Sequence, residues 1–392
     1  MLEKIKSKFI IKSIFGNLKR KLQLKIIKYN KNLSFRLDIT KKDFQVYSRL
    51  KEFNEIYELS IDDIDIFEID ACSKSIKDEG LKNLVGLKFK ELMNLNLQKN
   101  EITNVKILEK AEFKKLYILD LSYNLISDIS GLKNVNFKEL KNLNLSYNNI
   151  SDISILKSVN FIMLNSLDLS NNNIAHLNPL KDVKFNKDLK FLNLGGNKIS
   201  NINDINDINF ENLNYLYLNE NQISDITVLK SAKFSGLKEL ILRHNKITDI
   251  NVLSAVNFKY LVKLDLAWNK ISNIEIFEKV NFKQLKILDL YRNNISDINV
   301  LKETNFKNLN ELRIGNNRIS NISVFGKMNF ENLSLLDLSS NKITDIKFMS
   351  GLDYIKKLKV LRLENNKINE NENTETIKIL SEKIEKFRIR EL

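Results

Sequence analysis

One pattern of hydrophobic and polar positions returns along most of the chain, and Leu140–Ile153 (LKNLNLSYNNISDI) shows it clearly. Leucines or isoleucines occupy its first, fourth, sixth, eleventh and fourteenth positions, and an asparagine occupies the ninth. This asparagine recurs at steps of 24 residues, except for two steps of 25, at Asn100, Asn124, Asn148, Asn172, Asn197, Asn221, Asn245, Asn269, Asn293, Asn317, Asn341 and Asn366. A fixed period of this length is typical of a solenoid, so we predict twelve stacked coils.

Each coil is expected to contribute one short strand. Successive side chains of a strand point to opposite faces, so Leu143 and Leu145 should enter the core while Asn142, Asn144 and Ser146 face outward. Stacking the coils then places these strands side by side in a parallel sheet.

The recurring asparagine follows the strand, where the chain turns away and backbone groups lose their partners in the sheet. Its side-chain amide offers two donors and an acceptor, which are enough to bond backbone groups of its own coil and of the next coil. We therefore expect Asn221→Ala to lower the free energy of unfolding by ~1–3 kcal/mol.

A phenylalanine row has the same period and stands three residues before the first leucine position of each coil, or four residues before it in the coil of Phe185. Its members are Phe89, Phe113, Phe137, Phe161, Phe185, Phe210, Phe234, Phe258, Phe282, Phe306 and Phe330, with Ile355 in the last coil. An aromatic row can form a ligand site, but stacking inside the core is the interpretation that the period favours.

The spacing LxxLxLxxNxIxxI resembles the leucine-rich repeat, and the resemblance extends from Leu92 to Asn369. The short repeats are similar to those of intracellular phosphatase-regulatory proteins and of bacterial internalins. This resemblance implies an α/β solenoid, a curved horseshoe with a parallel β-sheet on its concave face, which recognises a protein through that face.

The outward strand positions change in character along the chain. In the first four coils they are mainly small and polar, interrupted by Ile118, Tyr123 and Tyr147, whereas aromatic residues and arginine follow from the fifth coil. Because such residues dominate protein-binding hot spots, we predict a partner-binding surface made of Tyr215, Tyr217, Arg243, His244, Trp268, Tyr291, Arg292 and Arg313. The alternative is that these side chains stack on one another for stability alone. Asp265 and Asp289 lie among them, and a surface of mixed charge argues against a nucleic-acid groove.

Residues 1–55 are predicted to form a basic helical N-terminal segment. Residues 1–50 hold fourteen basic and three acidic residues, and thus +11 of the net charge of +14. One interpretation is a helical cap on the solenoid. A second is an F-box-like module, which Ile14, Phe15 and Leu18 resemble, although the usual Leu-Pro and Trp of that family are missing. A third is a basic arm that contacts anionic membrane or nucleic acid.

The two ends of the repeat array are predicted to be capped. Residues 56–91 should form degenerate capping strands, one with Ile56, Leu59 and Ile61 in its core, the other with Ile64, Phe67 and Ile69. Cys72 would stand at the asparagine position of this second strand as a buried structural thiol. Residues 92–370 are expected to form the solenoid of twelve coils. Residues 371–392 form a C-terminal cap, with a helix that includes Ile377 and Leu380 and a last strand at Ile384, Phe387 and Ile389.

The composition bears on the expected location of the protein and on the classes of function that are open to it. A single cysteine allows no internal disulfide and favours a reducing compartment, so a cytoplasmic location is expected. No apolar stretch approaches the length of a membrane span, and no signal peptide is recognisable. His176 and His244 are the two histidines, and no cluster has metal-ligand spacing, so we expect no catalytic residue, metal or cofactor. These features predict a non-enzymatic scaffold or adaptor for a protein partner. The alternatives are a substrate adaptor of a ubiquitin ligase and a regulatory subunit of a phosphatase.

Overall fold

The structure is a computed structural model that describes residues 39–328 and 330–390, together with Phe15, Leu18, Leu22, Gln23 and Leu37. The chain divides into two compact units. The first consists of Met1–Ile150 with Ser158–Leu164, and the second of Ser151–Lys157 with Asn165–Leu392.

Three-residue strands recur once per coil, and fourteen of them occur among the described residues. They are β1 (Glu68–Asp70), β2 (Asn94–Asn96), β3 (Ile118–Asp120), β4 (Asn142–Asn144), β5 (Ser166–Asp168), β6 (Phe191–Asn193), β7 (Tyr215–Tyr217), β8 (Glu239–Ile241), β9 (Lys263–Asp265), β10 (Ile287–Asp289), β11 (Glu311–Arg313), β12 (Leu335–Asp337), β13 (Val360–Arg362) and β14 (Lys386–Arg388). In the first unit β1 to β4 pair in parallel in chain order. In the second unit β5 to β14 do the same. The predicted parallel sheet of a leucine-rich-repeat solenoid is therefore confirmed.

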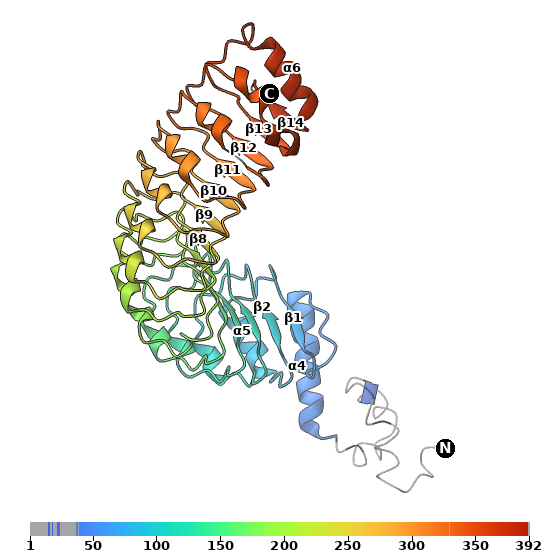
Figure 1. Ribbon diagram of the computed structural model, residues 1–392. Helices are drawn as coiled ribbons and strands as arrows, with labels where there is room; N and C mark the ends of the chain where they lie inside the picture. The colour runs from blue at the N-terminus through green and yellow to red at the C-terminus, as the bar shows by residue number, and fades with distance from the viewer. Residues whose placement is uncertain are drawn as a thin grey trace. The chain divides into compact units, whose positions relative to one another are not determined.

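Helices are few. The α-helices of the described part are α4 (Lys41–Tyr57), α5 (Lys77–Gly86) and α6 (Thr374–Lys383). Short 3-10 helices return the chain in the coils, namely η2 (Lys106–Lys110), η3 (Ser130–Leu132), η4 (Ser154–Lys157), η5 (Asn178–Leu180), η6 (Asn203–Asp207), η7 (Thr227–Ser231), η8 (Asn251–Ser254), η9 (Glu275–Glu278), η10 (Asn299–Glu303), η11 (Ser323–Lys327), η12 (Lys347–Gly351) and η13 (Asp353–Lys357). Figure 1 shows that, within the second unit, the strands lie along one side and the 3-10 helices along the other.

The core lies between the strands and the 3-10 helices. The central leucine of each strand from β2 to β13 is buried, and so are the isoleucines that follow the asparagine from Ile102 to Ile343. The predicted phenylalanine row is buried as well, together with Ile355, and the rings of Phe113 and Phe137 stack with their centroids 6.3 Å apart. The row is therefore a structural part of the core, as expected.

The asparagine row forms a ladder of buried hydrogen bonds. The Asn148 amide donates to the carbonyls of Leu145 and Ser146 in its own coil and of Leu121 in the preceding coil. Its Oδ1 accepts the Ile126 N–H, which also belongs to the preceding coil. The prediction that each asparagine bonds to the next coil is therefore wrong in direction, because the turn points the amide back along the solenoid.

The N-terminal capping region differs from the expected pair of strands. Ile56 lies in α4 with a side chain 57% exposed, and Leu59 and Ile61 follow the helix outside any strand, so the first predicted strand does not form. The second strand exists as β1, but Ile69 pairs with Leu95, which shifts the register by two residues. Phe67 is consequently 60% exposed instead of buried. Cys72 aligns with Gln98 and is half-buried, so its assignment to the asparagine position is wrong.

These errors have one cause, since this stretch does not follow the period that fixes the other coils. Helix α4 buries Leu50 and Phe53, and α5 buries Leu81 and Leu84. Ile14 and most residues before Ile39 lie outside the described residues. The F-box-like and basic-arm interpretations therefore stay predictions.

The C-terminal end agrees with the sequence. Helix α6 buries Leu380 and packs against η12 and η13, and β14 pairs Phe387 with Leu361 of β13. The strand and the helix thus lie against the last coil, in the position that a cap requires.

Candidate functional site

The outward side chains of the second unit fall into two rows, which the sheet register defines. The first row, here called the strand row, holds the last residue of each strand, and its members in β7 to β13 are Tyr217, Ile241, Asp265, Asp289, Arg313, Asp337 and Arg362. The second row, here called the turn row, lies three residues further on, and its members after β8 to β10 are His244, Trp268 and Arg292. Every residue of the strand row therefore lies one strand away from its neighbours in the row.

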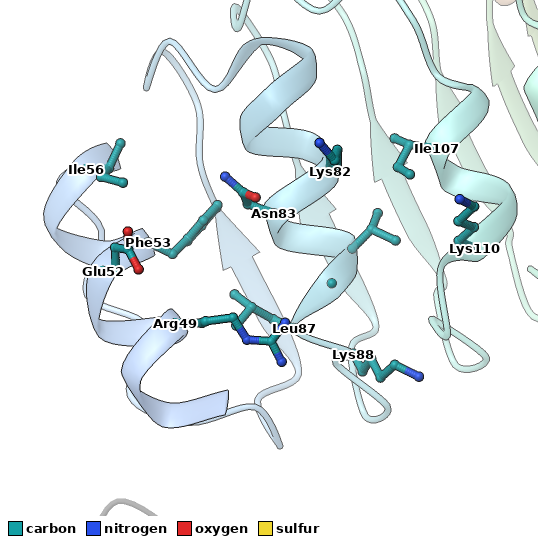
Figure 2. Close-up of a pocket in the computed structure, with 12 residues that line it drawn as sticks. Arg49, Glu52, Phe53, Ile56, Lys82, Asn83, Leu87, Lys88, Ile107 and Lys110 are labelled. Carbon is teal, nitrogen blue, oxygen red and sulfur yellow. The ribbon is translucent and has the colours of Figure 1, made fainter. Parts of the chain in front are cut away.

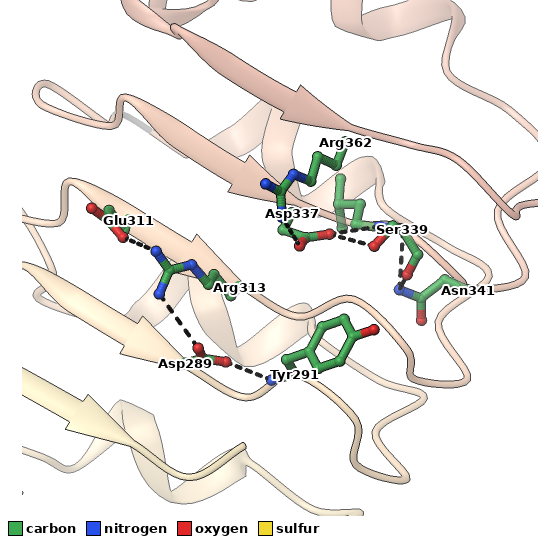
Figure 3. Close-up of polar contacts among 9 residues, drawn as sticks. Asp289, Tyr291, Glu311, Arg313, Asp337, Ser339, Asn341 and Arg362 are labelled. Atoms are coloured by element: carbon green, nitrogen blue, oxygen red, sulfur yellow. Dashed lines mark hydrogen bonds and ion pairs between the residues drawn. The ribbon is translucent and has the colours of Figure 1, made fainter. Parts of the chain in front are cut away.

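Acids and arginines alternate in the later part of the strand row. The Arg313 guanidinium donates to Asp289 Oδ2 at 3.5 Å and to Glu311 Oε2 at 2.5 Å, and Arg362 donates to Asp337 Oδ2 at 3.3 Å (Figure 3). The other oxygen of each aspartate accepts a backbone N–H two residues further on, as in the bond from the Tyr291 N–H to Asp289 at 2.9 Å. These bonds hold the side chains in fixed positions on the face of the sheet.

The turn row carries a stacked group of aromatic and cationic side chains. The Arg292 guanidinium carbon lies 3.8 Å from the centre of the Trp268 ring, and that of Arg243 lies 5.8 Å away. The His244 ring centre is 5.5 Å from that of Trp268. A guanidinium held over an indole face is a cation–π contact, worth about 0.5–2 kcal/mol. The Trp268 Nε1 is buried and has no hydrogen-bond partner among the described residues.

The backbone of the turn row is left-handed. His244, Trp268 and Arg292 have φ angles of 56°, 57° and 55°. Equivalent positions in other coils hold Asn171, Gly196, Asn316 and Asn365, residue types that adopt this conformation at little cost. The same left-handed position holds Lys99, Tyr123, Tyr147, Glu220 and Ser340 in further coils, so this backbone conformation belongs to the repeat and does not single out the three residues.

A tyrosine–phenylalanine group lies at the start of the strand row. The Tyr217 ring meets Phe191 edge-on, with centroids 5.2 Å apart, and its hydroxyl donates to Glu239 Oε2 at 2.8 Å. Burial, and then the bond to Glu239, raise the pKa of this hydroxyl. Tyr217 is therefore a neutral, fixed aromatic side chain.

Two buried carboxyl groups lie next to each other at the centre of the strand row. Asp265 and Asp289 are register partners on β9 and β10, and both are buried. Burial raises the pKa of Asp265, and the charge of Asp289 raises it further, against the backbone N–H of Ala267 and the charge of Arg243. Burial also raises the pKa of Asp289, against the Tyr291 N–H and Arg313.

The eight predicted residues all lie in the second unit, some of them on the strands and the others in the turns that follow the strands. Tyr215, Tyr217 and Arg313 lie on strands, whereas Arg243, His244, Trp268, Tyr291 and Arg292 lie in the turns, because each strand ends after three residues. Within this set Arg243, His244 and Arg292 each lie beside Trp268, and Tyr215 instead faces Phe191 at a ring distance of 6.4 Å.

Because the strands end after three residues, the prediction that Ser146 faces outward is also wrong. Ser146 is buried, and its N–H and hydroxyl both bond Asn144 Oδ1. Sequence reasoning also missed Glu239 as the partner of Tyr217. Comparing residues 24 positions apart would have indicated the Asp289–Arg313 pair, since these residues occupy the same place in successive coils.

Other candidate sites are weak. A pocket of about 600 Å³ lies beside α4 and α5, lined by Phe53 and Ile56 and by basic side chains such as Arg49, Lys82 and Lys110 (Figure 2). Within the described ranges no three His, Cys, Asp or Glu side chains are placed to hold a metal ion. No helix in the part that the structure describes is long and apolar enough to cross a membrane.

The repeat, the asparagine ladder and the parallel strands define the class, and comparison with solved structures agrees. The chain belongs to the leucine-rich-repeat family. It is similar to an internalin, inlF of Listeria monocytogenes, with 30% sequence identity over 79% of this chain and 93% of that one, at a TM-score of 0.59. A leucine-rich-repeat protein of Leptospira interrogans is 25% identical over 77% of this chain and 80% of that one, at a TM-score of 0.60.

A more distant match shows the fold alone. The plant peptide hormone receptor RGFR1, described in complex with RGF2, is 18% identical over 73% of this chain and 49% of that one, at a TM-score of 0.50. A scan against family models gave no match, and a search of curated proteins gave none either.

Proposed function

We propose that this chain is a non-enzymatic protein-interaction scaffold or adaptor, which binds a protein partner on the outward face of the sheet in its second unit. The proposed contact residues are Tyr215, Tyr217, Arg243, His244, Trp268, Tyr291, Arg292 and Arg313.

The observation that carries the proposal is the stacked group of the turn row, in which the Arg292 guanidinium carbon lies 3.8 Å from the centre of the Trp268 ring. The Arg243 guanidinium and the His244 ring lie beside the same indole, at 5.8 and 5.5 Å from its centre. The buried Nε1 of Trp268 has no hydrogen-bond partner among the described residues, so the group keeps an unused donor.

The chemistry of the surface suits a protein. Tryptophan, tyrosine and arginine are the residues enriched in binding hot spots, because each removes a large area from water at a low cost in entropy. Acids alternate with the arginines of the strand row, so the surface lacks the uniform positive charge that a nucleic-acid backbone requires. The fold supports the same role, since a receptor that shares it is described in complex with a peptide hormone.

The test is affinity capture with the triple variant Tyr217→Ala/Trp268→Ala/Tyr291→Ala. We expect wild-type protein to retain specific partners that the variant loses, while circular dichroism shows the same fold. The matched control is Tyr260→Ala, which removes an aromatic side chain that is 59% exposed outside both rows. Equal retention of the same partners by wild type and the triple variant would refute the proposed surface. A cytoplasmic location belongs to this proposal, and cell fractionation tests it.

A further inference from the structure

Aspartates at the last position of a strand, in either unit, follow one rule, which the register of the strands makes visible. An aspartate at this position accepts a hydrogen bond from the residue at the same position in the next coil. Five such pairs occur among the described residues: Asp70 with Asn96, Asp120 with Asn144, Asp168 with Asn193, Asp289 with Arg313, and Asp337 with Arg362. The donor is an amide in the first three pairs and a guanidinium in the last two. The carboxylate of each aspartate is therefore hydrogen-bonded by a side chain of the next coil.

Asp265 breaks this rule. The residue one coil further on is Asp289, which carries the same charge and offers no donor as a carboxylate. Asp265 Oδ1 accepts the Ala267 N–H at 3.0 Å, as the other aspartates of the row do. Its Oδ2 has neither a hydrogen bond nor an ion pair within the described residues. The residue is only 7% exposed, but this oxygen is not enclosed and reaches the surface of the sheet.

The nearby cations do not fill this position. Arg243 and Lys263 act on the Asp265 carboxyl by their charge, but neither forms an ion pair with it in the described part of the chain. The Arg243 guanidinium lies instead toward the Trp268 ring. Most of the carboxyl is buried, while its open oxygen is left to water, and a donor from outside the chain can reach it. The repeat does not need this acid, because Asn144 and Asn193 occupy the same position in other coils.

We propose that Asp265 receives a lysine or arginine side chain of the bound protein partner, which supplies the donor that the next coil lacks. This inference rests on the proposed function, because it assigns the central polar contact of the same face. A cationic side chain enters between Asp265 and the turn row, where Trp268 already holds one guanidinium against its ring.

A metal ion fits this position less well. Magnesium and calcium ions take six or more oxygen ligands, whereas Asp289 Oδ2 is already bonded to Arg313. The pair therefore offers one unbonded oxygen, which suits a single N–H donor.

The experiment uses the full chain and a displayed library of random peptides. Peptides are selected on the wild-type protein and counter-selected on the Tyr217/Trp268/Tyr291 triple alanine variant, so that the retained peptides need the proposed face. The affinity of the best peptide is then measured by fluorescence polarisation for wild type, Asp265→Asn and Asp337→Asn. Each lysine or arginine of the peptide is also replaced by glutamine.

We expect one cationic residue of the peptide to be essential, so that its replacement weakens binding about thirtyfold or more, as Asp265→Asn also does. Combining the two changes should weaken binding no further than either change alone. Asp337→Asn is the matched control, because Asp337 already has Arg362 as its partner, and it should bind as wild type does. Asp265→Asn should remain folded and should not melt below wild type at neutral pH. Asp265→Ser is the second variant if the asparagine side chain distorts the strand.

Two results would overturn the inference, and they are distinguishable. Peptides that need the three aromatic residues but bind Asp265→Asn as tightly as wild type would refute the role of Asp265 and leave the proposed function intact. If no peptide depends on the three aromatic residues, the proposed function fails, and the inference fails with it.

Discussion

Replacing Asn221 by alanine tests the ladder that holds the coils together. Asn221 is buried, and its Oδ1 accepts the Ile199 N–H of the preceding coil at 3.0 Å. Its Nδ2 donates to the carbonyls of Leu194, Leu218 and Asn219 at 3.0, 3.2 and 3.1 Å. The alanine variant loses all four bonds at once.

The cost is nevertheless expected to come mainly from one group. The three carbonyls each keep another donor, namely Asn197 Nδ2 on Leu194, Asn245 Nδ2 on Leu218 and the Gly196 N–H on Asn219. The Ile199 N–H keeps none, and Ile199 is fully buried. One buried donor left without a partner costs ~1–3 kcal/mol, so we expect the free energy of unfolding to fall by that amount and not by the sum of four bonds.

Urea unfolding followed by circular dichroism measures this loss, and hydrogen exchange locates it, because the Ile199 amide should exchange faster in the variant. Asn219→Ala is the control, since the Asn219 side chain makes no hydrogen bond among the described residues. An Asn221→Ala protein that unfolds at the wild-type urea concentration with an equally protected Ile199 amide would refute the ladder.

Asn221→Asp separates the acceptor from the donor. A carboxylate still accepts the Ile199 N–H, but its second oxygen then faces the carbonyls of Leu194 and Leu218. Burial beside these oxygens should raise the pKa of the carboxyl above its unfolded value, so the native state binds the proton more tightly. Stability should then be greatest at low pH and should fall as the pH rises through the folded-state pKa. A variant whose stability difference from wild type is the same at pH 4 and pH 8 would contradict this electrostatic reasoning.

Three further predictions concern the candidate surface and the C-terminal cap. Burial raises the pKa of Asp265 above its unfolded value of about 3.9, so the stability that its protonated form contributes is present at low pH and is lost as the pH rises. The stability of Asp265→Asn relative to wild type should therefore increase between pH 4 and pH 7. A stability difference between the two proteins that shrinks over this range would contradict the raised pKa of Asp265. Arg292→Gln should expose the ring of Trp268, the one tryptophan of the chain, and shift its emission to longer wavelength at a cost of about 0.5–2 kcal/mol, whereas unchanged emission would mean that the 3.8 Å stacking contact does not persist in solution. Deleting Asn373–Leu392 removes α6 and β14 and exposes the buried core of β13, so light scattering should detect aggregation and the melting temperature should fall; a monomeric protein with an unchanged melt would show that these elements are no cap.

The sequence predictions were accurate where the repeat has a regular period and were wrong where this period is absent. Where the repeat is regular, the buried side chains, the strand centres and the ladder asparagines were all predictable, because each coil can bury its apolar side chains only by stacking on an identical neighbour. Before Phe89 the period is absent, so the register of Ile69 and the helical state of Ile56 depended on packing against α5 and β2, which no local pattern indicates.

The candidate surface was predictable only in part for the same reason. The sequence determined that Tyr217, Trp268 and Arg313 lie at repeating positions outside the core, because a periodic chain must present the same position of every coil to the same side. The tertiary structure decided which of them touch. It ended the strands early and placed Trp268 in a left-handed turn under Arg292. It also set Asp265 beside a second acid, because contacts between coils join residues about 24 positions apart through side-chain conformations that the sequence pattern does not specify.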